Sequence, residues 1–262
     1  ILFKNASILG TQYIAKGYLG VSGRYIDYIG TAKPEKEYDT EIDMYNHMLI
    51  PGLVNCHTHS AMNLLRGLGS GLMLQDWLHT VWPVEDRMTD LDLENGMNLA
   101  IMEMLACGTT SFSDMYTHPW HTQKCIGPAG IKANLSAIMM LGFDQPDYEH
   151  YERRIKALEL YRDCNNTADG RLKIDFAIHA EYTSREDFAR KFIEEISSLD
   201  SRLHIHLSET EKEHAECIEK YGKLVADIVK YIEKDGHPNL RIDDNGLIFA
   251  NGRDKAVTWM NS

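Results

Sequence analysis

The chain has 262 residues, 44% of them hydrophobic and 25% charged, and a formal net charge of −12. This is the balance of an ordinary globular protein, and its acidic charge argues against nucleic acid or an anionic membrane as a partner, since both need a basic face. No apolar run approaches the ~20 residues of a membrane span, and the opening "ILFKNASILG" lacks the charged and apolar regions of a signal peptide.

Short strands and turns are predicted at both ends of the chain. Residues 1–50 alternate loosely between apolar and polar positions and are punctuated by glycines. Residues 223–262 return to the same kind of pattern after a different middle section. We therefore expect residues 1–50 and 223–262 to form one small β domain.

Strand and helix patterns alternate five times between residues 49 and 222, which predicts a parallel α/β architecture. One predicted helix covers residues 89–108, where Thr89 and Asp92 have the spacing of a capping box. The five predicted strands, in chain order, are 49–57, 109–116, 131–140, 172–183 and 202–210.

The first of these strands, predicted to be buried, ends in "NCHTHS". Side chains alternate across a strand, so His57 and His59 point the same way. Two neighbouring imidazoles at the end of a strand can chelate a metal ion. They can equally be two structural histidines with hydrogen-bond partners.

The last of these strands ends in "LHIHLSE", where His204 and His206 share a face. His206 is nearer the carboxyl end and is the better candidate ligand, whereas His204 could serve packing. Together with His57 and His59 it would make a nitrogen-rich site suited to zinc or another transition metal. Glu209 follows just beyond the strand, where a carboxylate can move protons, or can simply be an acid in the first turn of a helix.

Three further residues could contact a substrate. His179 ends the strand "LKIDFAIHAEYT" and could donate a hydrogen bond to a ring nitrogen, or be a buried histidine satisfied by the backbone. Trp77 and Glu85 lie in "LQDWLHTVWPVEDRM" after the first strand, where loops build substrate pockets. A tryptophan offers a face to a flat base and a carboxylate can bind the hydroxyls of a ribose, although the segment could merely pack its aromatic rings inward.

These motifs resemble those of the amidohydrolase superfamily, and more narrowly the methylthioadenosine/S-adenosylhomocysteine deaminases and related chlorohydrolases. The resemblance covers residues 1–222, in the segments "PGLVNCHTHSAMNLLRGLGSGLMLQDWLHTVWPVEDRMT", "CGTTSFSDMY", "AIHAEYT" and "LHIHLSETEKE". It implies a TIM-type (β/α) barrel over residues 51–222, with a small β-sandwich built from residues 1–50 and 223–262.

The resemblance also implies a function and a set of site residues. His57, His59 and His206 would hold one divalent metal, zinc in the first place, with iron, nickel or manganese as alternatives. Glu209 would shuttle protons while water attacks the amino-bearing carbon of an adenosine-type nucleoside such as methylthioadenosine or S-adenosylhomocysteine. His179 would contact the purine, Trp77 would line the pocket and Glu85 would hold the ribose hydroxyls.

The chain departs from the family pattern after residue 222. Family members carry a further histidine on the sixth strand and an aspartate on the eighth, and neither is found here. Five of eight strand–helix units are visible. The alternatives are therefore an inactive, truncated homologue, or a related hydrolase acting on guanine or a chlorinated triazine.

The sequence also indicates the setting and the partners of the protein. Five cysteines, an odd number with no CxxC pair, favour a reducing compartment, so we expect a cytoplasmic protein. Its partner would be a small-molecule substrate, with no nucleic acid and no membrane. A homo-oligomer is reasonable for a protein with large exposed barrel surfaces.

Overall fold

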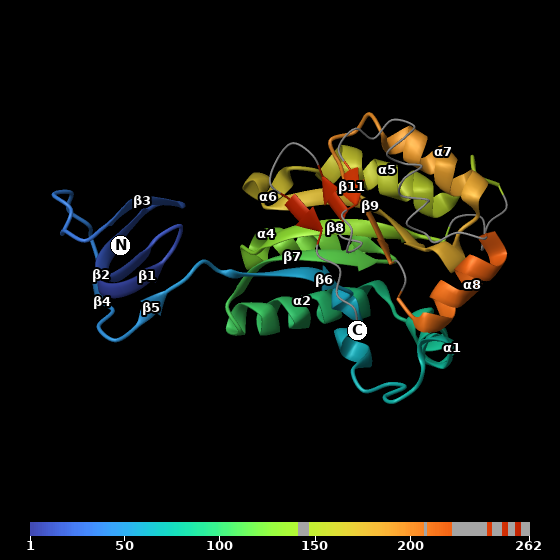
Figure 1. Ribbon diagram of the computed structural model, residues 1–262, viewed down its shortest axis with the longest axis horizontal. Helices are drawn as coiled ribbons and strands as arrows, with labels where there is room; N and C mark the ends of the chain where they lie inside the picture. The colour runs from blue at the N-terminus through green and yellow to red at the C-terminus, as the bar shows by residue number, and fades with distance from the viewer. Residues whose placement is uncertain (141–146, 207–208, 222–239, 243–247, 251–254, 258–262) are drawn as a thin grey trace. The chain divides into compact units, whose positions relative to one another are not determined.

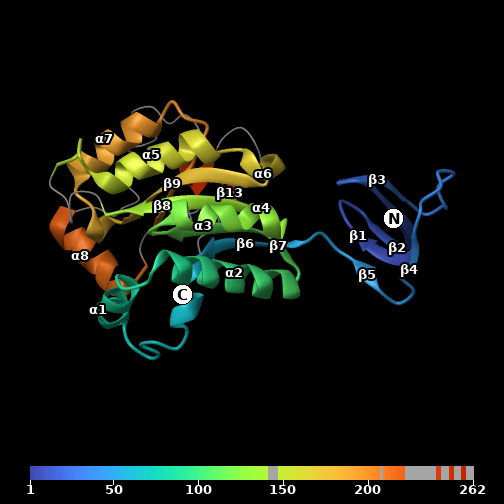
Figure 2. The same ribbon diagram turned by 180° about the vertical axis from the view of Figure 1, so that it is seen from behind.

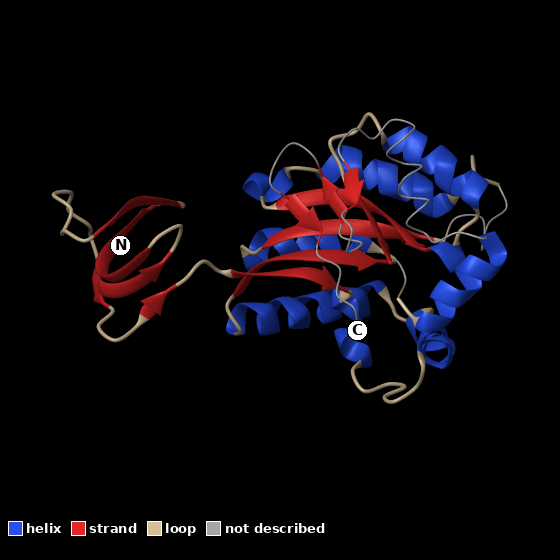
Figure 3. Cartoon of the chain, in the orientation of Figure 1, coloured by secondary structure: helices blue, strands red, loops and turns tan. Residues whose placement is uncertain are grey.

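The computed structural model describes residues 1–140, 147–206, 209–221, 240–242, 248–250 and 255–257 (Figure 1). The chain divides into two compact units, Ile1–Leu53 and Val54–Ser262. The first unit is built of strands alone, whereas the second alternates strands and helices (Figure 3). Across these described ranges, each helix is too short or too polar to cross a membrane.

The first unit is a five-stranded sheet in the order β3-β2-β1-β4, with β5 also paired to β1. Its strands are β1 (Leu2–Leu9), β2 (Tyr13–Ser22), β3 (Tyr25–Gly30), β4 (Glu41–Asp43) and β5 (Met48–Leu49). The central strand β1 alternates, so that Leu2, Ala6 and Ile8 are buried on one side. The strands predicted for residues 1–50 are thus confirmed.

Near the carboxyl end, three short described strands form a separate antiparallel sheet. They are β11 (Leu240–Ile242), β12 (Ile248–Ala250) and β13 (Lys255–Val257). The rest of residues 223–262 lies outside the described residues. That both ends of the chain share one sandwich stays a prediction.

The second unit is organised around a curled, open sheet in the order β10-β9-β8-β7-β6. Its strands are β6 (Leu53–Thr58), β7 (Thr109–Tyr116), β8 (Lys132–Met139), β9 (Leu172–Ala180) and β10 (Leu203–His206). Strands β7 to β10 pair in parallel, and β6 runs in the same direction beside β7 (Figure 1). This sheet is part of a (β/α) barrel, which confirms the predicted architecture.

Helices cover the outer face of this sheet, as Figures 1 and 2 show from the two sides. Apolar residues of α2, α5 and α7 form the core with the outward side chains of β7, β8 and β9. The helices are α1 (Leu74–Glu85), α2 (Asp90–Ala106), α3 (Pro119–Thr122), α4 (Ile126–Ala129), α5 (Glu152–Cys164), α6 (Thr167–Gly170), α7 (Glu186–Ile196) and α8 (Glu211–Tyr221). Short 3₁₀ helices are η1 (Ser60–Leu65), η2 (Gln123–Cys125) and η3 (Glu181–Thr183).

Helix α2 fixes the segment that follows β6. The predicted capping box is present: Thr89 accepts a hydrogen bond from the backbone of Asp92, and Asp92 accepts one from the backbone of Thr89. Further along α2, Gly96 faces η1, and a Cβ at this position would lie 2.3 Å from the carbonyl oxygen of Ala61. The absence of a side chain at Gly96 therefore lets the helix press against the backbone of η1.

One expectation about the sheet is wrong. The first strand was predicted to be buried, but Leu53 and Val54 in β6 are 51% and 64% exposed. A parallel strand is buried when it has a neighbour on both sides and helices on both faces. In the described part of the chain, β6 is an edge strand with β7 as its one neighbour in the sheet.

Candidate metal centre

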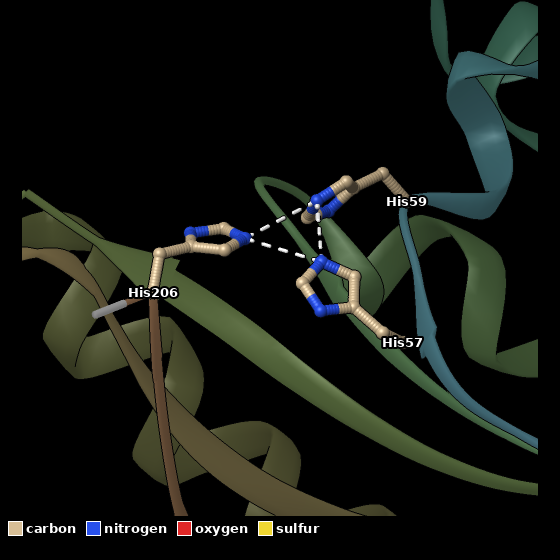
Figure 4. Close-up of side chains that lie close together, drawn as sticks. All are labelled: His57, His59 and His206. Carbon is tan, nitrogen blue, oxygen red and sulfur yellow. Dashed lines mark hydrogen bonds between the residues drawn. The ribbon is translucent and has the colours of Figure 1, made fainter. Parts of the chain in front are cut away.

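Three imidazole rings converge where β6 and β10 end (Figure 4). The Nε2 atoms of His57 and His59 are 3.2 Å apart, and the Nε2 atom of His206 lies 3.3 Å from each of them. Within the described residues, these three make the one group of histidine, cysteine or acidic side chains close enough to hold a metal ion. The structure therefore brings together the three ligands predicted from residues far apart in the chain.

This nitrogen triangle has the dimensions of a zinc site. Zinc–nitrogen bonds of ~2.05 Å at tetrahedral angles of ~109° put ligand nitrogens about 3.3 Å apart. The observed distances of 3.2 and 3.3 Å fit that value. Three ligands also leave a fourth tetrahedral position for water or substrate, as in catalytic rather than structural zinc sites.

Backbone carbonyls hold two of the rings in the tautomer that a metal requires. The Nδ1 atom of His59 lies 2.5 Å from the carbonyl oxygen of Met115, and the Nδ1 atom of His206 lies 2.8 Å from that of His179. A carbonyl oxygen only accepts, so both Nδ1 atoms carry the proton. Both Nε2 atoms then present lone pairs to the centre of the triangle, and a cation there removes their mutual repulsion.

Burial favours the neutral form of two of the three rings in the absence of metal. It lowers the pKa of His206 to about 3, helped by the nearby rings of His59, His179 and His57 and opposed by the hydrogen bond to the His179 carbonyl. The pKa of His57 is also lowered, first by burial and then by the charges of neighbouring histidines. Neutral imidazole is the form that binds a metal, so these shifts favour metal over protons near neutral pH.

A pocket opens beside the triangle. Its wall combines His59 and His206 with the other residues predicted for the site: Trp77, Glu85, His179 and Glu209. It is completed by ten side chains: Met62, Leu74, Leu78, Val81, Trp82, Tyr116, Thr117, Ile138, Met140 and Tyr182. Mostly apolar and aromatic walls with a few polar groups are typical of a small-molecule site.

Two of the pocket's polar groups can exchange protons or hydrogen bonds. Burial raises the pKa of Glu209, although the nearby His59 and Tyr182 lower it in part. Burial lowers the pKa of His179 to about 4, so its ring is neutral. The Nδ1 atom of His179 lies 3.0 Å from the hydroxyl oxygen of Thr183, which leaves Nε2 as the other hydrogen-bonding atom of the ring.

Helix α1 supplies the opposite wall. Trp77 donates its indole N–H to the carbonyl oxygen of Leu68 at 3.2 Å. Its ring lies against Gly69, which has a positive φ of 69°. Glu85, at the end of α1, accepts a hydrogen bond from the hydroxyl of Tyr116. Burial raises the pKa of Glu85, and the Tyr116 hydrogen bond opposes that shift.

The second histidine of β10 serves another purpose. His204 Nε2 lies 3.6 Å from the buried carboxylate of Asp175, and its Nδ1 atom lies 3.4 Å from the hydroxyl of Ser113. It is therefore His206, and not His204, that joins the ring cluster. The packing alternative considered for His204 fits this position.

Sequence reasoning missed two tyrosines of the pocket. Tyr116 ends β7, and Tyr182 follows β9 three residues after His179. Both come at carboxyl ends of strands, where barrel enzymes place their sites, and that position was the available signal.

Comparison with known proteins agrees with this geometry. The profile of the amidohydrolase family matches residues 48–245. A 5-methylthioadenosine/S-adenosylhomocysteine deaminase from Acetivibrio thermocellus is 35% identical over 236 residues, covering 87% of this chain and 54% of that protein. A 5′-deoxyadenosine deaminase from Methanobrevibacter smithii is 37% identical over 225 residues, covering 84% of this chain and 51% of that protein.

A solved structure shows the same fold. The crystal structure of a zinc-bound adenosine deaminase from Xanthomonas campestris superposes with a TM-score of 0.77 at 25% identity. The match covers 88% of this chain and 54% of that one. The chain thus spans about half the length of the curated relatives it matches.

Proposed function

The chain belongs to the amidohydrolase family, and we propose that it carries the metal site and purine pocket of a hydrolytic deaminase. The substrate would be an adenosine-type nucleoside such as methylthioadenosine, S-adenosylhomocysteine or 5′-deoxyadenosine. The observation that carries this proposal is the triangle of Nε2 atoms beside a pocket lined by aromatic, apolar and a few polar side chains. The names of the similar proteins support the choice of substrate class.

The donor set is three imidazole nitrogens, which suits zinc, and iron, nickel or manganese are alternatives. His57, His59 and His206 would hold the metal. Bound there, a divalent metal acidifies water so that it becomes a nucleophile near neutral pH.

Glu209 would move protons during deamination. Its raised pKa brings the carboxyl closer to neutral pH, where a group can both accept and give up a proton. It would take a proton from the attacking water and deliver it to the departing amine. Glu209 lines this pocket beside His59 and His206, which supports this role.

The other residues would orient the nucleoside. The Thr183 hydroxyl lies within hydrogen-bond distance of both His179 Nδ1 and the carbonyl oxygen of Ala180. In the tautomer that carries its proton on Nε2, His179 would donate a hydrogen bond to a purine nitrogen. Trp77 would offer its ring face to the substrate, because its N–H is already bonded to the backbone. Glu85 would accept hydrogen bonds from the ribose hydroxyls.

Ammonia release from methylthioadenosine, S-adenosylhomocysteine and 5′-deoxyadenosine, together with elemental analysis, tests the proposal. We expect His206→Asn to lose both bound metal and activity. His204→Asn is the matched control, since it alters a histidine two residues away on the same strand and should retain the metal. Activity that survives His206→Asn would rule the proposal out.

The remaining outcomes separate the alternatives. Metal binding without ammonia release from any amine identifies a catalytically inactive homologue. If the chain hydrolyses guanine or a chlorinated triazine but none of the three nucleosides, it belongs to another branch of the family. Glu85→Gln should weaken nucleoside turnover but not guanine turnover, because guanine has no ribose.

We also propose a reducing, cytoplasmic setting and a small molecule as the partner. The cysteines Cys56, Cys107, Cys125 and Cys164 are free thiols, as that setting requires. The net charge of −12 weighs against binding to nucleic acid or an anionic membrane. Association into a homo-oligomer is compatible with this fold.

A further inference from the structure

The carboxylate of Asp114 on β7 is hydrogen-bonded to residues at the end of β6, next to the predicted metal ligands. Asp114 is 1% exposed. Its Oδ1 atom accepts a hydrogen bond from the Thr58 hydroxyl at 2.7 Å and another from the Ser60 backbone N–H at 2.6 Å. The Ser60 hydroxyl in turn donates to the Thr58 hydroxyl oxygen at 3.0 Å. We call Thr58, Ser60 and Asp114 the β6–β7 clamp.

The clamp holds the two chain neighbours of His59. Thr58 precedes this histidine and Ser60 follows it, so the backbone of His59 is fixed on both sides by one carboxylate oxygen. The His59 ring is fixed by the next residue of β7, because its Nδ1 atom bonds to the Met115 carbonyl oxygen. Two consecutive residues of β7 therefore set both the backbone and the ring of one predicted ligand.

The clamp does this without entering the pocket. Side chains alternate across a strand, so Thr58 lies on the opposite face of β6 from His57 and His59. On β7, Asp114 shares a face with Phe112 and Tyr116, which pack against α2 and η1. None of the clamp residues lines the cavity beside the histidines. The clamp can thus affect the ligands through the position of β6, beside the electrostatic interaction between Asp114 and His59.

We propose that Asp114 is a positioning residue that pre-organises His57 and His59 for metal binding by fixing the end of β6. The inference rests on the metal site of the proposed function, but it does not depend on turnover. Such a support matters at an edge strand, because β6 has a sheet neighbour on one side only in the described chain. Residues that orient metal ligands typically change metal affinity by about 10- to 100-fold when removed.

The test measures the affinity of the metal-free 262-residue chain for Co²⁺ in four variants. Asp114→Leu removes both accepted hydrogen bonds. Asp114→Asn keeps a carbonyl oxygen at the Oδ1 position, and the described residues provide no hydrogen-bond partner that Oδ2 would lose. Thr58→Val removes the hydroxyl that donates to Asp114 Oδ1 at 2.7 Å and also lies 3.0 Å from the carbonyl oxygen of Ser113. Thr89→Ala is the control: it breaks the capping box of α2 and lowers stability without touching the clamp.

Positioning predicts a graded result. We expect Asp114→Leu to weaken Co²⁺ binding by at least about 10-fold and to alter the visible Co²⁺ spectrum, which reports coordination geometry. Thr58→Val should weaken binding by about 3- to 10-fold, since it removes one of the two bonds to Oδ1. Asp114→Asn should stay within about threefold of the unsubstituted chain, because it retains the acceptor, and Thr89→Ala should bind as the unsubstituted chain does.

Three results overturn the inference. One is a Co²⁺ affinity of the folded Asp114→Leu variant that stays within threefold of the affinity of the unsubstituted chain. If Asp114→Leu does not fold, the same result for Thr58→Val overturns the inference. Another is an equal loss of Co²⁺ affinity in Asp114→Asn and Asp114→Leu, which would show that the charge of Asp114, and not its hydrogen bonds, causes the effect. A third is an equal loss of Co²⁺ affinity in Thr89→Ala, which would show that lowered stability of the fold causes the effect. If the unsubstituted chain binds no Co²⁺, the metal site itself fails, and this inference with it.

Discussion

Acidification should destabilise the metal-free protein through His206. The folded chain buries this ring beside three other histidines, which lowers its pKa to about 3 from an ordinary value of 6.5. The unfolded chain exposes the ring and binds a proton at the ordinary pKa. Stability from this residue is therefore complete above pH ~6.5 and is lost progressively as the pH falls toward ~3.

The size of the effect follows from those two pKa values. Between pH 7 and pH 5 the unfolded chain takes up most of one proton at His206, and the folded chain takes up almost none. The linkage relation then gives a loss of about 2 kcal/mol in the free energy of unfolding over this interval. His179, whose pKa is lowered to about 4 by burial, acts in the same direction.

Chemical denaturation of the chelator-treated chain at pH 7 and pH 5 measures this loss. His206→Gln should reduce the pH dependence by about 2 kcal/mol, because glutamine does not titrate. The matched control for the substitution itself is His79→Gln, at an exposed histidine of α1. An identical pH dependence in His206→Gln and the unsubstituted chain would show that His206 is not held neutral by its surroundings.

Three further predictions concern packing, the pocket and the metal. Gly96→Ala puts a Cβ 2.3 Å from the Ala61 carbonyl oxygen and should lower the free energy of unfolding by about 1–3 kcal/mol. An unchanged denaturation midpoint would contradict the close packing of α2 on η1. Tyr116→Phe leaves the half-buried Glu85 without its donor and should raise KM for ribonucleosides about 10-fold with little change in kcat. An equal change with a 2′,3′-dideoxy substrate would contradict this. Zinc at 100 times its Kd should stabilise the chain by about 2.7 kcal/mol, an effect absent in His206→Asn and measured by thermal unfolding.

The order of strands and helices was predictable from the sequence because local pattern determines it. Apolar runs ending at glycines and polar turns marked each strand of the second unit, and the spacing of Thr89 and Asp92 marked the start of α2. The exposure of β6 was not predictable in the same way. An apolar strand such as "LVNCHT" is expected to be buried, but its burial depends on what lies beside it, and Leu53 and Val54 are exposed at the sheet edge.

The ligand triangle was predictable for a related reason. In a parallel sheet the carboxyl ends of all strands meet at one edge, so histidines that end β6 and β10 must approach one another once the sheet curls. The same argument distinguishes His206 from His204, which lies one inward-facing position earlier and instead meets Asp175. The partners of the rings were not predictable, because Met115 and His179 contribute backbone carbonyls, and every residue has one.

Asp114 shows what a closer reading of alternation could add. In "TTSFSDMY" the residues Phe112, Asp114 and Tyr116 fall on one face, and Phe112 packs in the apolar core behind the sheet. A carboxylate in that register is costly unless donors meet it, since burying a charge without partners is strongly unfavourable. Here the donors come from Thr58 at the end of β6 and from Ser60 at the start of η1. An acidic residue on the core-facing side of a strand therefore predicts hydrogen bonds to the adjacent strand. Here that adjacent strand leads into the predicted ligands His57 and His59.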